Sequence, residues 1–242
     1  MKHAPSHTDV PINPRFLAIA KDPRIIHGVH HHCDEWCRCC VVTERCLAFR
    51  CTAEHQRQRG RNPNEASFES LDEAVAFTKA LAALEGTPTD ELDQLMTRGD
   101  DVKDLCSDDP LLGIALEYAI RAGLLLAAHR DRSAPTRSRR PTPLEVVEWH
   151  HVRIYIKLAR ALVGHALTNK GTLDRREDAR GCAKLTRVSV ARSREALQQL
   201  PIASSDDVKT MVTLLDALES GIDERFPDAH AYLRIGLDVP VA

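Results

Sequence analysis

The sequence predicts an all-α fold: an antiparallel bundle of about four long helices, preceded by a small module rich in cysteine and histidine. Hydrophobic residues make up 43% of the chain, and Leu and Ala dominate over β-branched and aromatic residues, which favours helix over strand. Apolar residues recur at the helical period through the C-terminal part, and no alternating strand pattern occurs. Short connections between long helices favour antiparallel neighbours.

Capping signals set the expected helix starts. Ser70-Leu-Asp-Glu73 and Thr142-Pro-Leu-Glu145 are capping boxes, and Asp109 precedes a proline suited to the first turn of a helix. Gly86 and Pro227 supply stop signals. The predicted helices cover residues 70–86, about 91–106, 110–130, 143–167, 174–200 and 205–226.

Three regions follow from this pattern. We expect residues 1–26 to be an extended lead-in, because they are polar and rich in proline. Residues 27–51 form the Cys/His-rich module, and residues 70–242 form the helical bundle domain, with an apolar tail at 232–237 packed back onto it. The polar stretch 54–69 is expected to be a loop or a frayed helix end.

Charge and composition exclude several classes of protein. The formal net charge of −2 creates no overall field that would favour nucleic acid or a membrane surface. The chain has no run of about 18 apolar residues, so we expect no membrane span. Residues 1–7 lack the apolar core of a secretory signal, which predicts a cytoplasmic protein. Clustered cysteines in that reducing compartment are metal ligands or redox groups more often than disulfides.

The most unusual segment holds six of the eight cysteines between Cys33 and Cys51, directly after a run of three histidines. Thiolate and imidazole are ligands of soft and borderline metals. A compact C-x3-C-x2-C-x5-C run is typical of iron–sulfur clusters, and the predicted ligands of a 4Fe–4S cluster are Cys33, Cys37, Cys40 and Cys46. His30 or His32 could replace one of these thiolates, as could Cys39 or Cys51. Structural zinc is the alternative.

A resemblance rests on this segment. The string from Cys33 to Cys40, followed by Cys46, is similar to the Cys-Asp-x-Trp-Cys-x-x-Cys-Pro-x-x-x-x-x-Cys signature of a family of uncharacterised bacterial helical proteins. The likeness extends to Glu148-Trp149-His150 and to residues 178–184. This chain has Val41 where the family has proline, and it adds Cys39. The resemblance implies a metal-binding module beside a helical domain.

A second metal site is a further hypothesis. Glu148 and His151 lie on the apolar stripe of one predicted helix at the i, i+3 spacing that dimetal bundles use. Glu117, Asp178 and Glu219 on other helices would supply the remaining carboxylates. The alternative for these groups is a hydrogen-bonded core network.

Three functions are compatible with these features. The first is a cytoplasmic iron–sulfur protein that transfers electrons or senses oxidant, served by a redox partner protein. The second is a zinc-stabilised helical interaction protein without catalysis. The third is an enzyme with a carboxylate/His metal site in the bundle.

Overall fold

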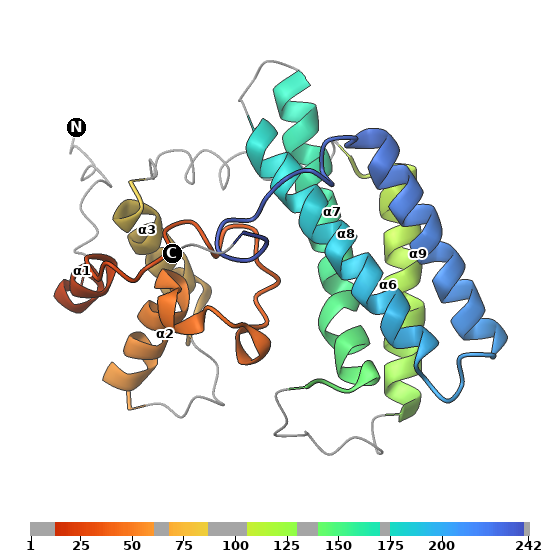
Figure 1. The fold of residues 1–242 in the computed structure, drawn as a ribbon, viewed down its shortest axis with the longest axis horizontal. Helices are drawn as coiled ribbons and strands as arrows, with labels where there is room; N and C mark the ends of the chain where they lie inside the picture. Colours follow the sequence, from red (N-terminus) through yellow and green to blue (C-terminus); the bar gives the residue numbers. More distant parts are fainter. Residues whose placement is uncertain (1–12, 61–67, 87–105, 130–139, 170–174, 240–242) are drawn as a thin grey trace, which may run out of the picture. The chain divides into compact units, whose positions relative to one another are not determined.

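The all-α prediction is confirmed by a computed structural model that describes residues 13–60, 68–86, 106–129, 140–169 and 175–239. These residues form seven α-helices and two short 3-10 helices (Figure 1). The described residues contain no strand, only an isolated bridge between Ile235 and Val239. The chain divides into two compact units, of which unit 1 comprises residues 1–31, 40–99 and 235–242, and unit 2 comprises residues 32–39 and 100–234.

Unit 1 contains three helices, α1 (Pro14–Ala20), α2 (Leu47–Gln58) and α3 (Leu71–Leu84), and the 3-10 helix η2 (Thr43–Arg45). Its main core is formed by Phe16, Ile25, Leu47, Cys51, Phe77 and Leu81. A second, smaller core joins Ile26, Val29 and Cys46, with Val42, Ala48, Phe49 and Leu237 packed against it.

Helix α1 corrects the prediction of an extended lead-in. Asn13 accepts a hydrogen bond from the Arg15 backbone N–H at 2.9 Å, and Pro14 occupies the first turn. Phe16 is buried and packs edge-on against Phe77, with 5.6 Å between ring centroids. A helix of seven residues shows fewer than two turns of periodicity, so its apolar pattern could not be recognised.

Unit 2 contains the four long helices α6 (Pro110–His129), α7 (Pro143–Asn169), α8 (Arg176–Gln198) and α9 (Asp206–Arg225), and the 3-10 helix η1 (Cys37–Cys39). The long helices begin and end within two residues of their predicted bounds. At α7 the Thr142 hydroxyl accepts from the Glu145 N–H, and the Glu145 carboxylate accepts from the Thr142 N–H at 2.7 Å. The capping box that predicted this helix is therefore formed.

Packing in unit 2 joins α7 with α8, α6 with α7, α6 with α9, and α8 with α9. The shared core includes fully buried side chains such as Ile154, Leu158 and Leu215. Helices α7 and α8 approach closely, because a Cβ added at Gly164 would lie 3.2 Å from the Cβ of Ala179. Unit 2 therefore has an extensive apolar core of its own.

The two units differ from the predicted regions. Helix α3 and the tail from Ile235 belong to unit 1, whereas residues 32–39 belong to unit 2. Within unit 1, Gly236 and Leu237 lie against the Ile26 and Val29 core. Helix α2 also extends into the predicted loop that begins at Glu54. Most of the predicted helix at 91–106 lies outside the described residues.

Helix α6 is long and apolar enough to cross a membrane by length and composition alone, and it is the one helix with that property among the described residues. A core helix of a soluble protein passes the same test, so the feature is weak support for a span. Leu112, Ala115, Tyr118 and Ala122 of α6 are buried in the core of unit 2.

Candidate metal centre

A pair of tight turns in unit 1 positions two histidines. The Val29 N–H donates to the Ile26 carbonyl, and the His31 N–H donates to the Gly28 carbonyl at 3.0 Å. Gly28 has a φ of +75°, a conformation that glycine adopts without steric cost. Because Ile26 and Val29 are buried in the smaller core, the turns hold His30 and His31 in a defined place.

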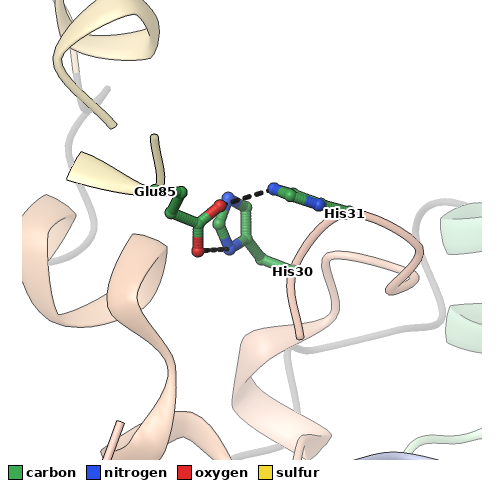
Figure 2. A group of neighbouring side chains, drawn as sticks. All are labelled: His30, His31 and Glu85. Carbon is green, nitrogen blue, oxygen red and sulfur yellow. Dashed lines mark hydrogen bonds and ion pairs between the residues drawn. The ribbon is translucent and has the colours of Figure 1, made fainter. Parts of the chain in front are cut away.

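The two histidines converge on Glu85, the residue that follows α3 (Figure 2). His31 Nε2 lies 2.5 Å from Glu85 Oε2, and His30 Nδ1 lies 3.7 Å from Glu85 Oε1. The Gly28 N–H donates to Glu85 Oε1 at 2.9 Å. The two imidazole rings pack edge-on at 4.6 Å between centroids. One potential ligand atom from each of the three residues lies within 4.8 Å of the other two.

Burial and contacts with neighbouring groups have opposite effects on the pKa values of Glu85 and His30. Burial tends to raise the pKa of Glu85, but the hydrogen bonds from His31 and Gly28 outweigh it and lower the pKa to about 2. Burial lowers the pKa of His30, against the opposing effect of Glu85. Glu85 is therefore ionised at pH 7, and His30 is neutral.

A second group of three potential ligands lies in unit 2 and joins His32 to Asp178 and Cys182 of α8. The His32 ring lies over Gly181, where an added Cβ would come within 2.4 Å of it. The Arg160 guanidinium forms two hydrogen bonds with Asp178, at 2.6 and 2.9 Å. Burial raises the pKa of Cys182 to about 11. The Asp178 carboxylate is already paired with Arg160 and the Cys182 thiol is protonated, so this group has little unpaired negative charge to offer a cation.

The segment 32–39 packs onto α7 through aromatic rings. The Trp36 and Trp149 rings are stacked, with 5.4 Å between centroids and an interplanar angle of 12°. Trp149 Nε1 donates to the Asp34 carbonyl at 2.8 Å, and Asp34 pairs with Arg192 of α8. Trp36 also packs edge-on against His150, with 5.7 Å between centroids.

His150 is an unusual buried group. Its side chain is fully buried, and neither ring nitrogen makes a hydrogen bond. Burial, with a smaller effect of Arg192, lowers the pKa of His150 to about 4. The imidazole is therefore neutral at pH 7 and behaves as an aromatic core residue.

The predicted cluster ligands fall in both units. Cys33, Cys37 and Cys39 belong to unit 2, whereas Cys40, Cys46 and Cys51 belong to unit 1. All eight cysteines of the chain are described, and none forms a disulfide. The ligand set formed by Cys33, Cys37, Cys40 and Cys46 stays a prediction from the sequence.

Cys51 has the surroundings of a core residue. It lies on the buried face of α2, in the main core of unit 1. Burial raises the pKa of its thiol to about 12. Such a thiol packs as a small hydrophobic side chain.

The predicted ligands on the long helices have different neighbours. Glu117 of α6 pairs with Arg121 at 2.9 Å. Glu148 and His151 of α7 line a pocket of about 310 Å³ together with His129 of α6. Asp178 is the one member of the set Glu117, Glu148, His151 and Asp178 that belongs to a group of three potential ligands among the described residues. Glu219 pairs with Arg187 and Arg194.

Sequence reasoning identified His30 and the histidine run, but it missed Glu85 and Cys182 as members of candidate groups. Glu85 follows the last residue of an ordinary helix and belongs to no motif, so only its contact with His31, 54 residues away, reveals it. The chain matches no family model, no curated protein and no solved structure with which it was compared.

Proposed function

We propose that this chain is a metal-binding protein that carries an iron–sulfur cluster on Cys33, Cys37, Cys40 and Cys46 and uses it for electron transfer or redox sensing. The observation that supports the proposal best is the density of thiols, six within nineteen residues, in a chain whose cysteines form no disulfide. Compact cysteine runs with short gaps are typical of cubane clusters. The ligand set follows from the sequence spacing.

The local structure of the cysteine segment supports a role for metal in its stability. Residues 27–46 contain turns and the two 3-10 helices, and no α-helix. In unit 1 the residues near Cys46 share a small core of three buried side chains, Ile26, Val29 and Cys46, with Val42, Ala48, Phe49 and Leu237 packed against them. A bound metal would add folding energy to a segment with a core of this size.

The four long helices supply a separate scaffold in this proposal. We infer that α6, α7, α8 and α9 form an antiparallel bundle, since each packs against two of the others through an extensive apolar core. Loss of a cluster should therefore leave these helices folded. The bundle would present the surface that a redox partner protein recognises.

Anaerobic purification with measurement of iron, acid-labile sulfide and zinc tests the proposal. We expect iron and sulfide, with a broad visible charge-transfer absorption that bleaches on reduction. The Cys37→Ser variant should lose iron and sulfide, whereas Cys106→Ser, outside the cysteine segment, should keep both. Stoichiometric zinc without iron, from iron-replete anaerobic cells, would instead identify a zinc-stabilised protein.

A further inference from the structure

We propose that His30, His31 and Glu85 form a second, separate site in unit 1, which binds one divalent transition-metal ion of the zinc type. The donors are two imidazole nitrogens and one carboxylate oxygen, a set that suits zinc and similar borderline cations. None of its three residues is among Cys33, Cys37, Cys40 and Cys46, the four cysteines proposed above to hold the cluster.

The distances between donor atoms are close to those of a metal site. A tetrahedral zinc ion with ligand bonds of about 2.0–2.1 Å holds its ligand atoms about 3.3 Å apart. His30 Nδ1 lies 3.7 Å from one Glu85 oxygen, and His31 Nε2 lies 2.5 Å from the other. One donor atom of each of the three residues lies within 4.8 Å of the other two, so side-chain rotations that bring these atoms closer together would let them hold one ion. Figure 2 shows both rings directed at the same carboxylate.

The carboxylate is oriented by the backbone. The Gly28 N–H holds Glu85 Oε1 at 2.9 Å, and the Glu85 side chain is only 4% exposed. Proteins usually orient the ligands of a metal ion by hydrogen bonds between those ligands and neighbouring groups that do not bind the metal themselves. The glycine turn that presents His30 and His31 therefore also orients the third ligand.

The charge balance at this place favours a cation. Glu85 caps the C-terminus of α3, where the helix dipole disfavours a negative group and favours a positive one. The Glu85 carboxylate is buried, and His30 makes no hydrogen bond through Nδ1. A divalent ion would neutralise Glu85 and use the lone pair of His30 at the same time.

The site has an exposed side. The His31 side chain is 47% exposed, so a bound ion would reach solvent. Three protein ligands leave a fourth position for water, as in exchangeable zinc sites. The Cys46 thiol lies near enough for Glu85 to affect its pKa, although burial is the larger cause of the rise in that pKa. The test must therefore distinguish nitrogen and oxygen donors from sulfur.

The experiment uses the full chain, prepared anaerobically, desalted, and titrated with Zn²⁺ under equilibrium dialysis. We expect one additional zinc ion per chain. His30→Ala and Glu85→Gln should each weaken that binding by about tenfold or more, since even the loss of a group that only supports a ligand costs about 10–100-fold. Iron and sulfide content should not change in either variant, which separates this site from the cysteine cluster.

Two matched controls and one spectrum complete the design. His27 and Glu44 are exposed in the same unit, so His27→Ala and Glu44→Gln should bind zinc as the natural chain does. Co²⁺ bound in place of zinc should show ligand-field bands without sulfur-to-cobalt charge transfer. A sulfur-to-cobalt band that disappears in Cys46→Ser would overturn the proposed donor set.

Hydrogen exchange on the natural chain keeps the test decisive if a variant fails to fold. Zinc should slow exchange at residues 26–31 and at the end of α3, and should leave α9 unchanged. The proposal is wrong if the natural chain takes up no additional zinc, or if His30→Ala and Glu85→Gln bind it undiminished. In either case His31 and Glu85 form only an ion pair.

Discussion

Replacement of His150 by phenylalanine tests the energetics of a buried, unpaired imidazole. The folded chain holds the pKa of His150 at about 4, below its ordinary value of 6.5, mainly because the ring is buried. Three charged groups face it: Arg192 of α8, Arg153 of α7 and Asp34 of segment 32–39. The unfolded chain therefore binds a proton between pH 6.5 and 4 that the folded chain does not.

The lowered pKa of His150 makes the stability of the folded chain depend on pH. Stability is complete above pH 6.5 and falls as the pH falls, because protonation favours the unfolded state. A difference of about 2.5 pKa values corresponds to about 3 kcal/mol in total, of which about 2 kcal/mol is lost between pH 7 and pH 5. Phenylalanine keeps the edge-on contact with Trp36 and removes two buried nitrogens without partners, so the variant should be equally or more stable at pH 7.

Urea unfolding of unit 2, followed at pH 7, 6 and 5, measures this prediction. The free energy of unfolding of His150→Phe should fall less steeply with decreasing pH than that of the natural chain, by about 2 kcal/mol over this range. His230→Gln, at an exposed position, should leave the slope as it is. An unchanged slope in His150→Phe, or a loss of several kcal/mol at pH 7, would refute the reasoning.

Three further substitutions test the packing and the caps. Gly181→Ala should lower the free energy of unfolding by about 1–3 kcal/mol, because the added Cβ would lie 2.4 Å from the His32 ring. Gly113→Ala is the control, because its Cβ would meet no atom within 4 Å and should not destabilise the fold. Equal effects of the two substitutions in thermal unfolding would contradict this prediction. Leu158→Ala, at a fully buried position, should cost about 2–5 kcal/mol in urea unfolding, and a loss below 1 kcal/mol would count against the assigned core. Ser70→Ala removes the cap of α3 and should cost about 1 kcal/mol, seen as faster hydrogen exchange in the first turn of that helix.

The long helices were predictable because their signals are local. The Thr142 to Glu145 capping box and the apolar period that follows lie within the helix they specify, and the structure forms both. Contacts between distant residues leave no such signal. Trp36 stacks on Trp149, and His31 meets Glu85, only because separate elements fold together.

The division of the cysteine segment was unpredictable for a related reason. Within the segment from Cys33 to Cys51, the chain passes from unit 2 to unit 1 between two neighbouring cysteines, Cys39 and Cys40. Nothing in the local pattern marks that position as a boundary. Within unit 2 the buried Trp36 stacks on Trp149 of α7, a contact between residues far apart in the sequence.

The stacked indoles give this chain a built-in optical reporter. Trp36 and Trp149 are its only tryptophans, and their rings lie nearly parallel, with the Arg153 guanidinium 3.9 Å from the centre of the Trp149 ring. All intrinsic tryptophan emission therefore originates from one contact between segment 32–39 and α7. Two indoles this close couple electronically, so detachment of the segment would abolish an exciton signal in circular dichroism and shift the emission to longer wavelength. Because Trp36 directly precedes Cys37, the same emission would register any metal centre that quenches it from that residue.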